Sequence, residues 1–158
     1  MAVTIREAQS AELPAINDII ERAVRTWNLP ERVLRLSIPL YQYDPVAFEE
    51  LTAVVAEDDA GEPVGVATWE PAAAADCPVA GGGLLLHGIY VAPEHARQGI
   101  GRALLAACRD AAQDAGLAGV LVKAQGDAEP FFEAAGLERL PVADTDRDYA
   151  RRYWLPVA

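Results

Sequence analysis

The chain is poor in the residues that hold metal ions and disulfides. Among its 158 residues there are two cysteines, Cys77 and Cys108, and two histidines, His87 and His95. Two cysteines are too few for a disulfide framework, and no Cys-x-x-Cys pair is present, so two reduced thiols are expected. Because no cluster of Cys and His shows the spacing of metal ligands, the sequence predicts no metal site.

Positive charge is also scarce. The sequence has 13 basic residues against 24 acidic ones, a net charge of −11, and Lys123 is its single lysine. Contacts with nucleic-acid phosphates need clustered positive charge, so no nucleic-acid partner is expected. The acidic, arginine-rich composition favours GC-rich codon usage as its explanation. The alternative is an acidic surface that attracts a cationic ligand such as a small amine.

Long apolar runs are absent. No run approaches the length of a membrane span, and "MAVTIREAQ" lacks the basic and apolar regions of a signal peptide. No membrane partner is therefore expected, and a cytoplasmic location is predicted. The hydrophobic fraction of 52% and the charged fraction of 23% are typical of a globular protein. The length favours one domain over residues 1–158.

Strand and helix patterns alternate along the chain. Apolar residues at helical spacing predict helices over 11–24, 100–115 and 127–136, and one or two short helices between 27 and 51. Alternating or apolar β-rich runs predict strands over 3–9, 52–58, 63–71, 84–93, 118–124, 137–142 and 149–157. This order, with a β-meander first, predicts a mixed α/β sheet.

The segment "ARQGIG" (96–101) joins a nearly all-apolar strand to an apolar helix. No Ser, Thr, Asp or Asn caps that helix, so its first backbone N–H groups lack the usual partner. Gly99 and Gly101 let a ligand approach the backbone, and Arg97 and Arg102 add positive charge. Unsatisfied N–H groups and the helix dipole favour an anion, so the turn predicts a phosphate site. The alternative is a tight turn that needs glycine for its own geometry.

Two common phosphate motifs do not fit the turn. A Rossmann turn needs a third glycine where Leu104 stands, and a P-loop needs Gly-Lys-Ser/Thr. The segment instead resembles motif A (Q/R-x-x-G-x-G/A) of the GNAT superfamily of CoA-dependent N-acetyltransferases. "QGDAEPFFEAAGL" (125–137) resembles that family's last motif. The resemblance implies the GNAT-type α/β (α+β) fold, a largely antiparallel mixed sheet with splayed central parallel strands, flanked by helices.

The resemblance also implies a co-substrate, acetyl-CoA, with no metal. Backbone groups of the strand would pair with the pantetheine arm, and amides of the glycine turn would hold the pyrophosphate. The residues implied to contact the cofactor are Ile89, Tyr90, Val91, Arg97, Gln98, Gly99, Ile100, Gly101, Arg102, Ala103, Gln125 and Phe132. The acceptor would be a primary amine of a small molecule or peptide. A homodimer is left open.

Three positions depart from the family pattern. Ala96 replaces the usual Gln or Arg, and Gln125 stands where Asn is usual. Phe132 stands where many members place the Tyr that protonates the departing CoA thiolate. Because Phe has no proton to give, the alternative function is a weak or inactive domain that binds acyl-CoA as a sensor or partner-binding module.

Another proton carrier would have to replace the missing tyrosine. His87 and Tyr90, on the central strand, are the candidate catalytic residues, and a histidine buried for packing is the alternative interpretation of His87. Glu70, Tyr149 and Tyr153 are further candidates, as is solvent. Aromatic residues could line a pocket for the acceptor or simply belong to the core, namely Trp27, Tyr41, Tyr43 and Trp69.

Overall fold

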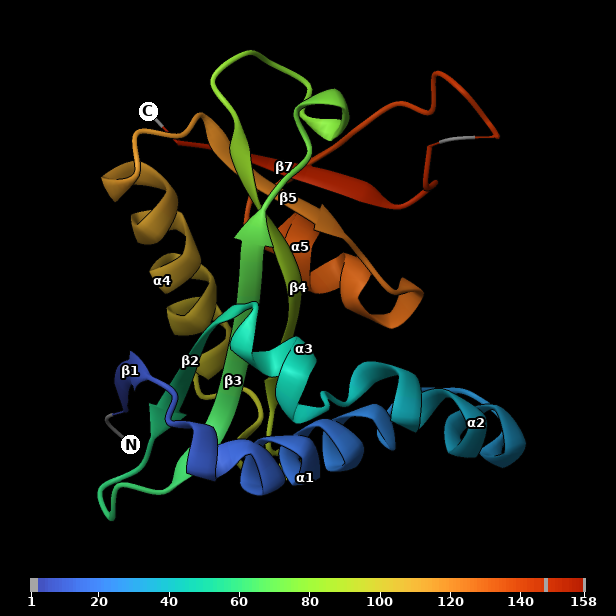
Figure 1. The fold of residues 1–158 in the computed structure, drawn as a ribbon. Helices are drawn as coiled ribbons and strands as arrows, with labels where there is room; N and C mark the ends of the chain where they lie inside the picture. The colour runs from blue at the N-terminus through green and yellow to red at the C-terminus, as the bar shows by residue number, and fades with distance from the viewer. Residues whose placement is uncertain (1–2, 147, 158) are drawn as a thin grey trace. The chain divides into compact units, whose positions relative to one another are not determined.

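A computed structural model describes residues 3–146 and 148–157. Its strands and helices are shown in Figure 1. The helices are α1 (Leu13–Val24), α2 (Glu31–Tyr41), α3 (Pro45–Glu49), α4 (Ile100–Asp114) and α5 (Glu129–Ala134). The strands are β1 (Thr4–Glu7), β2 (Thr52–Glu57), β3 (Pro63–Pro71), β4 (Gly83–Val91), β5 (Gly119–Lys123), β6 (Glu138–Arg139) and β7 (Arg152–Pro156).

The described strands form one seven-stranded sheet in the order β1-β2-β3-β4-β5-β7-β6. β4 and β5 run parallel, whereas β1 pairs antiparallel with β2 and β7 pairs antiparallel with β5 and β6. The β4–β5 register covers Gly83–Leu86 against Gly119–Val122, and β4 continues to Val91 beyond its last pair. This mixed, largely antiparallel sheet with flanking helices confirms the predicted fold class.

Contacts within the chain divide it into two compact units. Unit 1 comprises Met1–Thr68 and Ile89–Leu105, and unit 2 comprises Trp69–Gly88 and Ala106–Ala158. The boundaries cut β3, β4 and α4, so each of these elements contributes residues to both units. One domain over residues 1–158 stays a prediction.

The core of unit 1 forms around the apolar face of α1. Pro14 is tolerated in the first turn of this helix, because the N–H that proline lacks has no helical partner there. The apolar residues of α1 recur at helical spacing and are buried: Leu13, Ile16, Ile19, Ile20 and Val24. They pack with residues from α2, α3 and three strands: Leu34, Ile38, Phe48, Ala53, Val55, Val66 and Tyr90.

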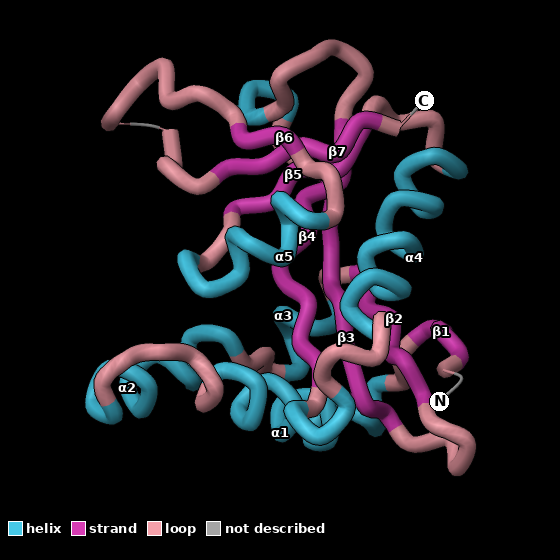
Figure 2. The backbone as a smooth tube through the Cα atoms, turned by 180° about the vertical axis from the view of Figure 1, so that it is seen from behind, coloured by secondary structure: helices cyan, strands magenta, loops and turns pink. Residues whose placement is uncertain are grey.

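In unit 2, β5 is hydrogen-bonded to β4 on one side and to β7 on the other, and Figure 2 shows β5, β7 and β6 side by side. Two glycines make room for the buried indole of Trp154 on β7. A Cβ added to Gly119 would come within 2.5 Å of that ring, and one added to Gly83 within 3.0 Å. Any side chain at Gly119 would therefore force β7 to move.

Candidate functional site

The glycine turn lies in unit 1, where β4 passes through the short 3-10 helix η3 (Pro93–His95) into α4. Gly99 has φ +81°, in the left-handed region that favours glycine. A Cβ built there meets no atom within 4 Å, so the backbone conformation rather than crowding requires glycine. Arg97 also has a positive φ, +63°, the single such case among the described non-glycine residues. The turn thus holds an arginine in a conformation that L-residues disfavour.

The start of α4 is open to a ligand. Residues 96–99 are exposed, whereas Ile100 is buried and anchors the helix. The first backbone N–H groups of a helix have no acceptor within it. Here the Ala103 N–H donates to the Gly99 carbonyl at 3.0 Å. The Arg97 guanidinium makes no hydrogen bond or ion pair within the described part of the chain. This arrangement suits an anion.

Contacts within unit 1 hold the segment ahead of the turn. The Ala92 N–H donates to the Val64 carbonyl on β3 at 2.9 Å. Arg22 of α1 donates to both oxygens of Glu94, at 2.8 and 2.7 Å, and this contact lowers the pKa of that carboxyl. Sequence reasoning missed this anchor, because the two residues lie 72 positions apart.

His95 lies directly before the glycine turn. Its Nδ1 atom is buried and has no hydrogen-bond partner among the described residues.

Tyr90, one of the two candidate catalytic residues, belongs to the core of unit 1. Its side chain is 8% exposed and packs in the same cluster as the buried face of α1. Burial, with Tyr43 and Tyr41 nearby, raises the pKa of the phenol. A weaker acid is a poorer proton donor, so the structure gives Tyr90 no advantage over His87.

The other candidate, His87, lies in unit 2 and is paired with Glu70. The His87 Nε2 atom is 2.5 Å from the Glu70 Oε2 atom. Both side chains are accessible, at 35% and 42% exposure. The sequence presented these residues as alternatives, and the structure brings them together across β3 and β4. A carboxylate in this position orients the imidazole.

The two tyrosines near the C-terminus are already engaged within unit 2. The Tyr153 hydroxyl donates to Glu133 at 2.8 Å and to Glu129 at 3.1 Å. Burial and these two carboxylates raise the pKa of Tyr153 to about 12. The Tyr149 hydroxyl donates to the Ala124 carbonyl at 2.8 Å. Either phenol would have to give up its present partner before it could deliver a proton elsewhere.

Phe132 and Gln125 have packing and capping roles of their own. Phe132, on α5, is 4% exposed, and its ring lies 5.2 Å from that of Phe131 and 6.3 Å from that of Tyr153. The Gln125 side chain accepts the Asp127 N–H at 2.7 Å and caps the 3-10 helix Gly126–Ala128. Contact of either residue with a cofactor stays a prediction.

Arg97→Gly is expected to raise stability while it weakens binding of a phosphate ligand. Removing the strain of an L-residue in the left-handed conformation raises the free energy of unfolding by about 1–2 kcal/mol. The extra conformational freedom of glycine in the unfolded chain offsets about 0.5–1 kcal/mol of that gain. The net gain of up to about 1.5 kcal/mol in the free energy of unfolding should therefore raise the midpoint of thermal unfolding by up to about 6 °C. Arg97→Lys, which keeps the charge and the conformation, is the control for calorimetric titration with CoA. A variant that loses stability and binding together would contradict this role for Arg97.

Two other kinds of feature are absent from residues 3–146 and 148–157. No group of three or more His, Cys, Asp or Glu side chains there could hold a metal ion. No helix in those residues has both the length and the apolarity to cross a membrane. The expected absence of a metal and the cytoplasmic location both stay predictions.

The sheet with its central parallel pair, followed by the glycine turn and α4, is the architecture of an acyltransferase domain. The Acetyltransferase (GNAT) domain family matches residues 49–138, more than half of the chain. The chain therefore belongs to the GNAT acetyltransferase family. No curated protein matches it significantly.

Solved structures show the same fold over nearly the whole chain. The PaiA N-acetyltransferase of Thermoplasma acidophilum, in complex with coenzyme A, is 14% identical, with 98% of each chain covered and a TM-score of 0.74. A GNAT family acetyltransferase of Brucella melitensis, in complex with acetyl-CoA, is 19% identical, with 99% of this chain and 89% of that chain covered and a TM-score of 0.66. A phosphinothricin acetyltransferase of Sinorhizobium meliloti, also with acetyl-CoA, is 20% identical, covering 99% and 89%, with a TM-score of 0.65. At these identities the likeness establishes the fold.

Proposed function

We propose that the chain transfers an acetyl group from acetyl-CoA to a primary amine of a small molecule or peptide. The observation that carries this proposal is the exposed turn ahead of α4, with its positive-φ residues Arg97 and Gly99. The similar structures from Thermoplasma, Brucella and Sinorhizobium hold CoA or acetyl-CoA, which supports that ligand class.

The residues of the turn fit a pyrophosphate. In the proposal, backbone N–H groups of Gln98, Gly99, Ile100 and Gly101 donate to its oxygens, and Arg97 supplies charge. Ala103 is left out of this set because its N–H already donates to the Gly99 carbonyl. Ile89 and Val91 offer extended backbone for the amides of a pantetheine arm, as an added strand would use it.

The His87–Glu70 pair supplies proton transfer in this proposal. A neutral amine attacks the thioester carbonyl, forming the C–N bond, and neutral His87 accepts the proton that the nitrogen loses. The C–S bond then breaks, and the imidazolium returns a proton to the thiolate, so CoA leaves as a thiol. Glu70 orients the His87 ring through its contact with the Nε2 atom. His87 precedes Ile89 by two residues on the same strand.

Phe132 supports a second candidate function, a domain that binds acyl-CoA and catalyses little. A buried phenylalanine at this position cannot protonate a thiolate. The turn serves this alternative equally well, so turnover rather than binding separates the two functions.

The deciding experiment measures release of free CoA from acetyl-CoA across a panel of amines, with an amine-free reaction as control. We expect release that depends on the amine and persists in EDTA, and calorimetry should show binding of acetyl-CoA. Binding without release from any amine would favour the sensor function. Absence of acetyl-CoA binding would overturn both.

A further inference from the structure

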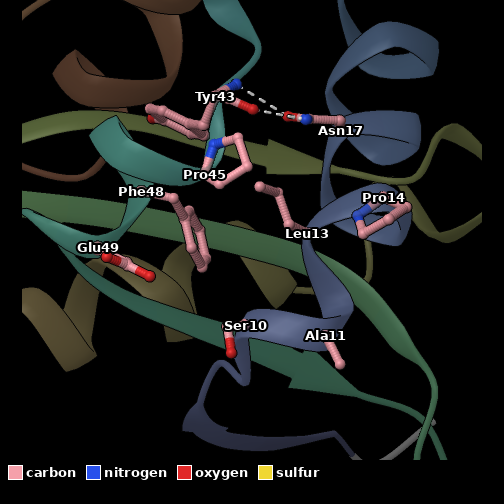
Figure 3. A pocket seen from close by; sticks show the side chains of 9 residues that line it. All are labelled: Ser10, Ala11, Leu13, Pro14, Asn17, Tyr43, Pro45, Phe48 and Glu49. Carbon is pink, nitrogen blue, oxygen red and sulfur yellow. Dashed lines mark hydrogen bonds between the residues drawn. The ribbon is translucent and has the colours of Figure 1, made fainter.

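Unit 1 contains a cavity that the proposed reaction does not use. It has a volume of about 410 Å³ and lies between the start of α1 and the segment around α3 (Figure 3). Its lining residues are Ser10, Ala11, Leu13, Pro14, Asn17, Tyr43, Pro45, Phe48 and Glu49. A cavity of this size falls in the range of sites for small organic ligands.

Hydrogen bonds on two sides of the cavity fix its shape. The Asn17 side chain donates to the Tyr43 carbonyl at 2.8 Å and accepts the Tyr43 N–H at 2.9 Å, the two contacts dashed in Figure 3. The Tyr43 hydroxyl is 2.6 Å from the Thr68 hydroxyl on β3. Asp44 caps α3 by accepting the Ala47 N–H at 2.8 Å. A wall that is already ordered spares a ligand the cost of ordering it.

Most of the wall is apolar. Leu13 and Phe48 are 8% and 7% exposed, and Pro14 and Pro45 also line the cavity. The rings of Tyr43 and Phe48 are 6.0 Å apart and tilted by 50°. Such a wall takes a hydrocarbon or aromatic body, and aromatic faces also attract a cation.

One carboxylate, Glu49, completes the lining. A neighbouring cavity of about 220 Å³ shares Ser10, Phe48 and Glu49 with the first and adds a second carboxylate, Glu7. Neither carboxylate forms a hydrogen bond or ion pair with any side chain in the described part of the chain. Uncompensated negative charge beside an apolar wall is complementary to a positively charged group on an apolar body.

We propose that this cavity binds a small organic cation, a primary ammonium group carried on an aromatic or aliphatic body. The ammonium group lies at Glu49, and the body lies against Phe48 and Pro45. The site is separate from the glycine turn, because it lies at the first turns of α1. Arg22, near the other end of that helix, makes the contact with Glu94 ahead of the turn.

Calorimetric titration without acetyl-CoA tests the site, with 2-phenylethylamine and its neutral analogue 2-phenylethanol as probes. The amine should bind about tenfold more tightly than the alcohol, equivalent to about 1.4 kcal/mol. Glu49→Gln should remove most of that difference. Glu50→Gln, at the neighbouring residue that lines neither cavity, should leave amine affinity unchanged. The proposal would be overturned if the wild type bound 2-phenylethylamine and 2-phenylethanol with equal affinity. It would also be overturned if Glu49→Gln and Glu50→Gln bound 2-phenylethylamine with equal affinity.

A second pair of variants separates this site from the acyltransferase reaction. Ala11→Phe places a ring in the cavity and should abolish binding of both probes while CoA release continues at the normal rate. Gly101→Glu, which alters the turn, should bind 2-phenylethylamine as the wild type does. Amine binding that survives Ala11→Phe, or that Gly101→Glu removes, would place the cation elsewhere and overturn the proposal.

Discussion

Replacing His87 with Gln should lower kcat for CoA release by about 10²–10⁴-fold, the usual contribution of a positioned acid or base. Glutamine can keep a hydrogen bond to Glu70, so the strands are undisturbed, but it cannot carry the proton. Acetyl-CoA affinity should stay within about twofold of the wild-type value, because no phosphate contact is removed. Steady-state kinetics measures kcat, and calorimetry on the same preparation measures the affinity for acetyl-CoA.

Two companion variants make the His87 result decisive. Glu70→Gln should lower kcat less than His87→Gln does. The His87 imidazole would lose the carboxylate that orients it, but it could still carry the proton. Phe132→Tyr should change the rate little if His87 carries the proton. A rise in rate with Phe132→Tyr, together with unchanged turnover in His87→Gln, would show instead that the site lacks a proton carrier. Normal turnover in all three variants would exclude both accounts.

Gly101→Glu should weaken acetyl-CoA binding by at least tenfold, about 1.4 kcal/mol. The glutamate adds a negative charge and bulk within the first turn of α4, where a pyrophosphate would need free amides and positive potential. Gly101→Ala separates charge from bulk: alanine favours the helix and should keep most of the affinity. Gln113→Glu, an exposed site near the end of the same helix, is the control for net charge. If Gly101→Glu and the wild type bound acetyl-CoA with equal affinity, the phosphates would have to bind at a different place.

Local sequence signals predicted the strands and helices that build the turn. The helix expected over 100–115 is α4, Ile100–Asp114, and the strand expected over 84–93 is β4, Gly83–Val91. Both patterns are strong because each element buries a continuous apolar face, and glycine marks the boundary between them. The segment from 27 to 51 was predicted less sharply, since its prolines interrupt the helical pattern.

Side-chain pairings could not be predicted, because they depend on how strands align. Glu70 and His87 are 17 residues apart, and only the placement of β3 beside β4 brings them together. Tyr90 lies on an apolar strand, and the sequence pattern of that strand does not show that the Tyr90 side chain packs in the core of unit 1. Of the aromatic residues considered for an acceptor pocket, Tyr43 lines the cavity in unit 1, whereas Trp27 and Tyr41 contact each other edge to face with centroids 5.1 Å apart.

The positive φ of Arg97 has a consequence for which substitutions evolution would accept at this position. Folding alone favours glycine at a left-handed position, so stability does not select for arginine at position 97. Selection for a bound anion would supply the opposing force. Descendants that have lost the ligand should therefore replace this arginine with glycine or asparagine early. The residue found at this one position then distinguishes lineages that still bind the ligand from those that keep only the fold.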